Sequence, residues 1–117
     1  MITLYGISNC DTVKKARSWL SSRNIDFEFH DFKKAGLTPE LSQRWLQQAS
    51  FEQIINRKGL TWRGLTDELK ASITNNDNAQ KLMLDKTSVI KRPILEQDGK
   101  LLHIGFDEAT YSKLFNF

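Results

Sequence analysis

A single cysteine, Cys10, is the residue of this chain best suited to nucleophilic chemistry. It ends the segment Gly6-Ile7-Ser8-Asn9-Cys10, which follows the apolar, β-prone run 2–5 and precedes a stretch with helical spacing from Asp11 onward. A cysteine in such a strand-to-helix turn faces free backbone N–H groups and the positive end of the helix dipole, and both favour a thiolate. Thiol pKa values at such places fall from about 8.5 to roughly 3.5–7.5. A lone cysteine is otherwise most often a small buried hydrophobe, but the strand-turn-helix context favours a reactive thiol.

Two arginines and a proline are the other candidate site residues. Pro93 follows Arg92 and begins an apolar run, and proline is tolerated at the start of a strand because it need not donate to the ladder there. The Arg92–Pro93 bond can be cis, which exposes backbone polar groups to a ligand, although only about 5–6% of such bonds are cis. Arg57 lies in the loop Asn56-Arg57-Lys58-Gly59 and can bring a cation to the same site, whereas a surface arginine is usually just solvated.

The elements that must position Cys10 are predicted to form a βαβ unit. Apolar residues recur at helical spacing after the turn, at Val13, Ala16, Trp19 and Leu20, and predict an amphipathic helix that ends near Asn24. Alternating apolar and polar residues over 25–32 predict a half-buried strand. A strand, helix and strand in this order predict parallel strands with a right-handed crossover.

Residues 38 to 88 are predicted to be a helical insertion. Thr38 followed by Pro39 is a helix start, a short turn of helix is expected at 51–55, and Thr66 caps a further helix. Asp77 with Gln80 three residues later predicts a capping box for the last helix of the insertion.

The end of the chain is predicted to be a β-hairpin and a helix. The turn Asp98-Gly99 joins two apolar runs, 94–97 and 100–104, and is typical of a two-residue hairpin turn. Asp107 can cap a final helix through Ala109, Leu114 and Phe115. With no internal repeat or linker, the element order βαβ, helical block, ββα is expected to form a single domain over residues 1–117.

Composition limits the classes of function. The chain of 117 residues is 39% hydrophobic and 26% charged, as expected of one globular domain. One cysteine allows no internal disulfide, and His30 and His103 are too far apart in sequence for zinc-site spacing, so no metal is expected. The net charge of +3 favours small anionic ligands, but without a run of like charges it makes nucleic acid an unexpected partner. The N-terminus lacks signal-peptide features, so a cytoplasmic location without membrane contact is expected.

Four separated motifs resemble the arsenate reductase (ArsC)/Spx/YffB family, and most closely its YffB branch. They cover essentially the whole chain in order: residues 5–16 around Cys10, Asn56-Arg57-Lys58-Gly59, Lys91-Arg92-Pro93-Ile94 and Ile104-Gly105-Phe106. The resemblance implies an α/β, thioredoxin-like fold with a mixed four-stranded sheet and a helical insertion.

The resemblance also implies roles for particular residues. Cys10 is then the nucleophile, and Arg57 and Arg92 hold an oxyanion and the thiolate. Pro93 corresponds to the cis-proline of thioredoxin-like folds. The residues that would cradle the bound group are Asn9 and Thr12.

Two departures from the family pattern bear on function. Arsenate reductases carry a further arginine after the hairpin, whereas this chain has Ile104-Gly105-Phe106 there. Spx regulators often carry Cys-x-x-Cys, whereas the fourth position here is Val13, so an intramolecular switch is impossible. Arsenate as substrate and the regulator interpretation are both disfavoured.

Any catalytic cycle that uses a single cysteine must pass through an intermolecular mixed disulfide or a covalent adduct of the thiol with an oxyanion. A thiol from another molecule then resolves this intermediate. The leading hypothesis is a thiol reductase with glutathione as co-substrate, no bound cofactor, and a small anionic or thiol substrate. Glutaredoxin is the alternative source of the external thiol. The alternative functions are arsenate reduction with glutathione and glutaredoxin, and a non-enzymatic, Spx-like regulator that binds RNA polymerase.

Overall fold

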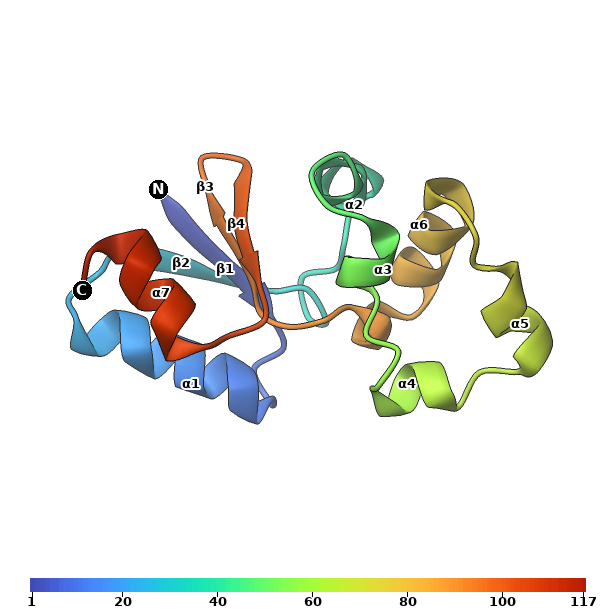
Figure 1. The fold of residues 1–117 in the computed structure, drawn as a ribbon, viewed down its shortest axis with the longest axis horizontal. Coiled ribbons are helices and arrows are strands. Elements are labelled where there is room, and N and C mark those ends of the chain that lie inside the picture. The colour runs from blue at the N-terminus through green and yellow to red at the C-terminus, as the bar shows by residue number, and fades with distance from the viewer. The chain divides into compact units, whose positions relative to one another are not determined.

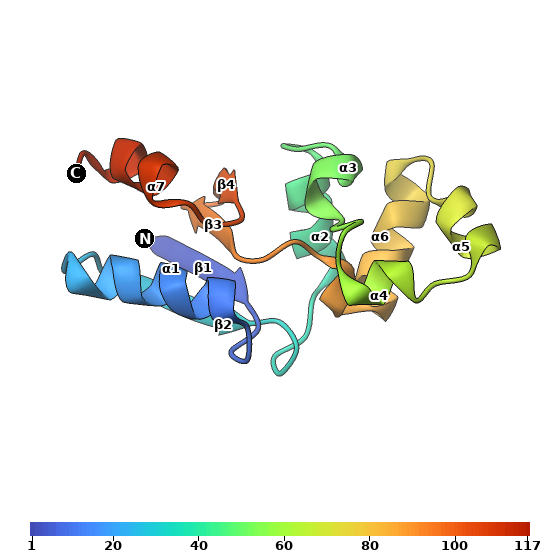
Figure 2. The ribbon, with the colours of Figure 1, turned by 60° about the horizontal axis from the view of Figure 1, so that its bottom comes forward.

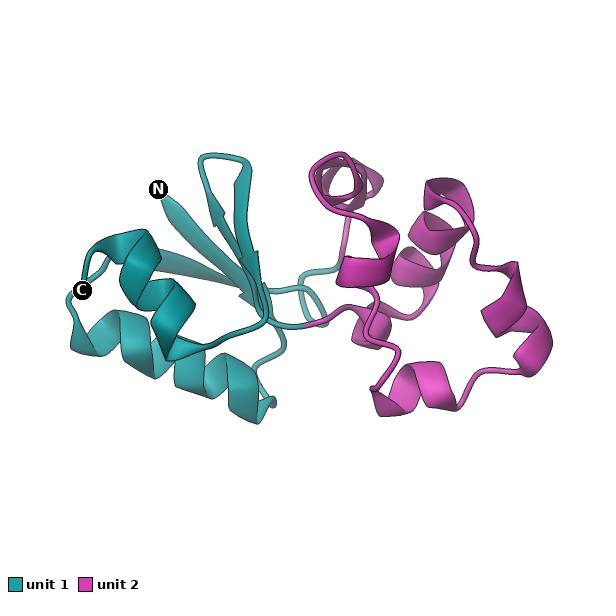
Figure 3. Ribbon diagram, in the orientation of Figure 1, with its two compact units in different colours: residues 1–36, 92–117 teal, residues 37–91 magenta.

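The computed structural model describes all 117 residues and divides them into two compact units. One unit comprises residues 1–36 and 92–117, and the other comprises residues 37–91 (Figure 3). The second unit contains the whole predicted insertion of residues 38 to 88. The interpretation of the two units as a single domain stays a prediction.

The first unit is a mixed sheet with two helices (Figure 1). Its elements are β1 (Ile2–Gly6), α1 (Asp11–Ser22), β2 (Phe27–Asp31), β3 (Ile94–Gln97), β4 (Lys100–Ile104) and α7 (Glu108–Phe115). The strand order is β2-β1-β3-β4, with β1 parallel to β2 and antiparallel to β3, and with β3 antiparallel to β4. The predicted α/β fold with its mixed four-stranded sheet is confirmed.

The core of the first unit lies between the sheet and the two helices. The four apolar positions of α1 predicted from helical spacing are all buried. Leu4 and Leu95 from the sheet pack against Trp19 of α1 and Tyr111 of α7 in one hydrophobic cluster. The rings of Trp19 and Tyr111 meet edge to face, with centroids 5.5 Å apart. The two helices therefore share one face of the sheet.

The final helix packs the predicted Phe115 against the core, but its fully buried residue, Tyr111, was not predicted. Asp107 caps α7 as expected, because its side chain accepts a hydrogen bond from the Thr110 backbone N–H at 2.7 Å. Ala109 and Leu114, however, are exposed, and Tyr111 is fully buried. An aromatic ring brings a larger apolar surface to the core than alanine does, so the helix turns Tyr111 inward.

The hairpin has the predicted two-residue turn and one irregularity that was not predicted. Asp98 and Gly99 both have positive φ, 52° and 84°, as a type I′ turn requires. The register between β3 and β4 shifts between Leu95 and Glu96, which marks a β-bulge. Local apolar alternation does not reveal such a shift, because the extra residue is defined only by its pairing with the other strand.

The second unit is helical. Its elements are α2 (Pro39–Leu46), α3 (Phe51–Ile54), α4 (Leu60–Arg63), α5 (Asp67–Ser72), α6 (Asn76–Asp85) and the 3₁₀ helix η1 (Thr87–Val89). Thr38 and Thr66 accept hydrogen bonds from backbone N–H groups three residues later, which confirms the predicted helix starts. The short α4, between Gly59 and Gly64, was not predicted. No helix anywhere in the chain has the length and apolar character needed to span a membrane.

The predicted capping box at Asp77 and Gln80 is wrong. The N-cap of α6 is Asn75, which exchanges side-chain-to-backbone hydrogen bonds with Asn78 at 3.0 and 3.1 Å. Gln80 instead donates to the carbonyl oxygen of Pro39 and the hydroxyl of Ser42 in α2, both at 3.0 Å. Asparagine caps a helix as well as aspartate does, so two equally good start signals stand two residues apart and only packing against α2 decides between them.

Candidate functional site

Cys10 is the N-cap residue of α1, in the strand-to-helix turn that the sequence predicts. Its backbone is extended, with φ −142° and ψ 123°, and its carbonyl oxygen accepts the first helical hydrogen bond from the Lys14 N–H at 2.9 Å. Its thiol is free and the residue is half-buried. Figure 2 shows this turn at the arrowhead end of β1, where α1 begins. The thiol therefore lies at the positive end of the α1 dipole.

A close approach between β1 and α1 fixes the start of the cysteine loop. A Cβ atom on Gly6 would lie 2.7 Å from Cγ2 of Val13, a residue with no exposed surface. Real Cβ atoms do not approach other heavy atoms that closely, so only glycine allows β1 to end against α1 in this way. Val13, the position at which Spx-type proteins often have a second cysteine, is here a core residue.

Asp31, the last residue of β2, ties the cysteine loop to its neighbour. Its carboxylate accepts hydrogen bonds from the backbone N–H of Ser8 at 3.1 Å and from those of Lys33 and Lys34 at 3.0 and 3.2 Å. Partial burial tends to raise the pKa of this carboxyl, but the hydrogen bonds from Ser8, Lys34 and Lys33 outweigh burial, and the pKa lies below its usual value. A charged Asp31 thus restrains the backbone two residues before Cys10.

The pairing of the strands brings Pro93 to the same end of the sheet. Ile94 pairs with Tyr5 in an antiparallel ladder, so β3 starts where β1 ends and the cysteine loop begins. The Arg92–Pro93 peptide bond is cis, as the family resemblance implies. The carbonyl oxygen of Pro93 accepts a hydrogen bond from the Gly105 N–H at 2.8 Å, which places the loop after β4 beside it.

The structure places the remaining candidate residues as follows. Arg92 is half-buried and directly precedes the cis bond, whereas Asn9 is exposed in the cysteine loop. Thr12 is also exposed and is the second residue of α1, just after the cysteine loop. Arg57 belongs to the unit of residues 37–91, where its guanidinium carbon lies 5.5 Å from the centroid of the Trp62 ring. Its predicted role at Cys10 stays a prediction.

Asp31 is the site residue that sequence reasoning missed. A signal for it exists in the sequence: an aspartate at the end of an alternating strand can accept hydrogen bonds from the backbone N–H groups two and three residues later in an Asx turn, here those of Lys33 and Lys34. Its contact with Ser8, 23 residues away, follows only from the pairing of Gly6 with Asp31.

No group of three or more side chains from histidine, cysteine, aspartate and glutamate lies close enough together to hold a metal ion. His30 lies against the carbonyl oxygen of Gly36, with its Nε2 atom 3.2 Å away. His103 lies 3.2 Å from the carboxylate of Asp107.

A mixed sheet of this order, with a cysteine in the loop after its first strand and a cis-proline before its third, places the chain in the thioredoxin-like class of α/β proteins. A model of the ArsC family matches residues 5–114. The chain therefore belongs to the ArsC family, which includes arsenate reductases.

Individual relatives agree with this assignment. An uncharacterized protein of Haemophilus influenzae is 41% identical over 115 residues, which cover 98% of this chain and 99% of that protein. The global transcriptional regulator Spx of Streptococcus agalactiae is 34% identical over 116 residues, covering 92% of this chain and 78% of the regulator.

Solved structures are similar over nearly the full length. A protein named YffB shares 38% identity with a TM-score of 0.89, and the match covers 97% of each chain. A protein of Brucella melitensis described as related to arsenate reductase shares 46% identity with a TM-score of 0.80, covering 99% of this chain and 95% of that one.

Proposed function

We propose that this protein is a thiol-dependent reductase that uses Cys10 as its single nucleophile and glutathione as its external thiol. The observation that carries the proposal is the position of Cys10: a free, half-buried thiol at the N-cap of α1, at the end of the sheet where Pro93 precedes β3. Membership of the ArsC family supports a role in thiol chemistry.

The proposed cycle has two thiol–disulfide exchanges. The Cys10 thiolate attacks the glutathione sulfur of a glutathionylated substrate, so a Cys10–glutathione disulfide forms and the substrate leaves as a thiolate. A second glutathione thiolate then attacks the glutathione sulfur of this mixed disulfide. Glutathione disulfide leaves and Cys10 is again a thiolate, so each cycle consumes one free glutathione, whose sulfur is oxidised as the substrate sulfur is reduced.

Each remaining candidate residue has a role in this proposal. Arg92 and Arg57 stabilise the Cys10 thiolate and the carboxylates of glutathione by charge-assisted hydrogen bonds. The backbone near Pro93 binds the extended peptide. Asn9 and Thr12 contact the bound group, since both side chains are exposed next to Cys10 in the chain.

The test compares the wild type with Cys10→Ser on a glutathionylated peptide, with glutathione, NADPH and glutathione reductase present. We expect the wild type to consume NADPH in proportion to substrate and the variant to fall to the uncatalysed rate. Arg92→Lys keeps the charge but loses the planar fork, so we expect an intermediate rate. A wild type as inactive as Cys10→Ser would refute the proposal.

A second candidate function is supported by the similarity to Spx of Streptococcus agalactiae, a global transcriptional regulator. In this alternative the chain is a non-enzymatic module that binds RNA polymerase. Recovery of polymerase subunits with the tagged chain, undiminished in Cys10→Ser, would favour it over the reductase.

Arsenate reduction is the third candidate, and the resemblance of the Brucella melitensis protein to arsenate reductases supports testing it. Residues 104–106, at the end of β4 and in the loop after it, contain no arginine. We therefore expect little turnover in an assay with arsenate, glutathione and glutaredoxin, under conditions in which the glutathionylated peptide is reduced.

A further inference from the structure

The excess positive charge of the protein lies on α1. Of the 17 basic and 14 acidic residues of the chain, Lys14, Lys15, Arg17 and Arg23 lie on α1 or at its C-cap, together with only one acid, Asp11. Removing these four bases and one acid leaves 13 of each sign, so the rest of the chain carries no net charge. The net charge of +3 is therefore that of one helix, and Cys10 is the N-cap of that helix.

Aromatic rings hold the two arginines of this helix in place. The guanidinium carbon of Arg17 lies 4.1 Å from the centroid of the Phe29 ring, and that of Arg23 lies 4.1 Å from the Trp19 ring. Arg23 also donates to the hydroxyl of Ser22 at 3.1 Å. None of the cations of α1 forms an ion pair, since the salt bridges join other residues. Cations that are already ordered and not neutralised lose little entropy when they bind an anionic surface.

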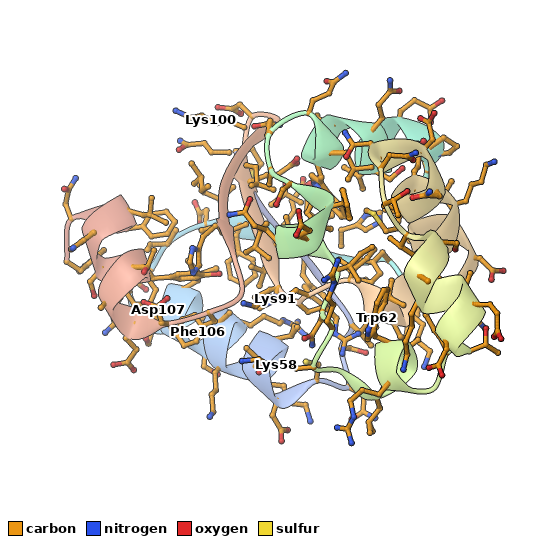
Figure 4. The ribbon with its side chains drawn as sticks, turned by 45° about the vertical axis from the view of Figure 1, so that its right-hand side comes forward. Lys58, Trp62, Lys91, Lys100, Phe106 and Asp107 are labelled. Atoms are coloured by element: carbon orange, nitrogen blue, oxygen red, sulfur yellow. The ribbon has the colours of Figure 1, made fainter.

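A groove runs beside the same helix. It has a volume of about 470 Å³, with Trp19 and Phe106 among its apolar lining and Lys14, Lys15 and Arg23 among its cations. Glu108 is the single acid in the lining. Figure 4 shows Phe106 and Asp107 between the end of β4 and the start of α7, next to α1. The groove therefore combines an apolar wall with three positive charges along α1, the helix whose N-cap is Cys10.

We propose that this basic face, formed by Lys14, Lys15 and Arg23, docks an acidic protein whose thiolate attacks the Cys10 sulfur of the Cys10–glutathione disulfide, so that a Cys10–partner disulfide forms and glutathione leaves as a thiolate. The proposal rests on the proposed thiol chemistry and names a partner for it. A helix of 12 residues extends about 18 Å, so a partner bound along it lies within reach of the thiol at its N-terminus. An acidic protein fits better than nucleic acid, because a protein can supply both the thiol and apolar side chains for the groove.

The test uses two synthetic peptides that each contain one cysteine, flanked by four glutamates in one and by four glutamines in the other. Cys10 is first loaded with thionitrobenzoate, and each peptide thiolate then attacks the Cys10 sulfur, forms a Cys10–peptide disulfide and releases coloured thionitrobenzoate. Each rate is divided by the rate of the same peptide with free dithiobis-nitrobenzoate, because the flanking charges alter the peptide thiol itself. We expect the glutamate peptide to react about tenfold faster at about 20 mM salt and less than about twofold faster at about 300 mM.

Charge reversal separates the basic face from a general effect of net charge. Lys14→Glu with Lys15→Glu should abolish the preference for the glutamate peptide; both side chains are exposed and make no side-chain hydrogen bond, so the fold should be retained. Lys100→Glu with Lys113→Glu makes the same change of charge away from the groove lining, on the first unit, and should preserve the preference. Lys100 starts β4 at the hairpin turn, at the other end of that strand from Phe106 (Figure 4).

Binding is measured independently of Cys10 chemistry with a fluorescent glutamate peptide that has serine in place of its cysteine. Loss of binding in Lys14→Glu/Lys15→Glu, and not in the control, supports the basic face even if glutathione-dependent reduction fails. An equal preference for the glutamate peptide in both double variants would overturn the proposal. Displacement of the peptide by a short DNA duplex that binds more tightly would also overturn it, in favour of nucleic acid.

Discussion

In the unit of residues 1–36 and 92–117, the surroundings of Cys10 come from segments that lie far apart in the sequence. The pairing of Gly6 with Asp31 and of Tyr5 with Ile94 brings three of them to one end of the sheet. In the unit of residues 37–91, by contrast, four helices begin at an N-cap whose side chain accepts a hydrogen bond from the backbone N–H three residues later. These N-caps are Thr38, Ser50, Thr66 and Asn75. Substitutions that disturb this pairing in the first unit should therefore change the reactivity of Cys10, whereas cap substitutions in the second unit should change stability alone.

The largest expected effect on stability is that of Gly6→Ala. Its Cβ would collide with Val13, a β-branched and fully buried residue that cannot easily move. We expect a loss of about 1–3 kcal/mol in the free energy of unfolding, measured by urea denaturation, together with a changed alkylation rate of Cys10. Gly64→Ala, whose Cβ would meet only ordinary contacts, is the matched control. Equal stability of the two variants would mean that β1 and α1 do not approach as closely as the structure has them.

Asp31→Asn tests the link between β2 and the cysteine loop. The side-chain amide cannot accept all three backbone N–H groups, so we expect a loss of about 1–3 kcal/mol at pH 7 and faster hydrogen exchange at Ser8. Because the folded-state pKa of Asp31 is lowered, its stabilisation is present above the ordinary value near 3.9 and is lost as the pH falls through the folded-state pKa. The difference between wild type and variant should therefore shrink below about pH 4.

The control for Asp31→Asn is Asp26→Asn, an exposed aspartate just before β2. This change should alter the free energy of unfolding by no more than about 0.5 kcal/mol. The rate of hydrogen exchange at the Ser8 N–H should stay that of the wild type. If the two variants behave alike across the pH range, the Asp31 carboxylate does not restrain the loop.

Thr66→Ala is expected to act on the helical unit alone. It removes the acceptor for the Leu69 N–H, at 3.1 Å, and should cost about 1 kcal/mol of stability. The rate of Cys10 alkylation in the folded protein should be unchanged. A changed alkylation rate of Cys10 in this variant would show that the Thr66 cap and the cysteine loop are coupled. It would contradict the expectation that caps in the second unit affect stability alone.

The smallest expected effect on stability distinguishes the two candidate N-caps of α6, Asn75 and Asp77. Asn75→Ala should cost about 1 kcal/mol, because the observed capping box is lost, whereas Asp77→Ala should change stability by no more than about 0.5 kcal/mol. Thermal unfolding monitored by circular dichroism can measure both. The reverse order would restore the capping box first predicted from the sequence.

Local sequence patterns were sufficient to predict those structural features that depend on neighbouring residues alone. The buried face of α1, the caps at Thr38 and Thr66, and the Asp98-Gly99 turn each depend on a few neighbouring residues, and each was predicted correctly. The family resemblance added the cis-proline, which a base rate alone does not favour.

What sequence reasoning missed depends on pairing between distant segments. The contact of Asp31 with Ser8, the register shift between β3 and β4, and the contact of Gln80 with α2 each exist because two separate elements pack together. Of the candidate site, the turn around Cys10 was predictable from its own residues. The residue that restrains this turn was not, because it comes from the next strand.

The central claim is that the turn at the N-terminus of α1 makes Cys10 a reactive thiol. The most direct test is the rate of Cys10 alkylation by iodoacetamide at pH 7, in the folded protein and in urea. We expect the thiol at the N-cap of α1 to react about fivefold faster in the folded protein than in urea. Equal rates in the two states, or a folded protein that does not react, would contradict the claim.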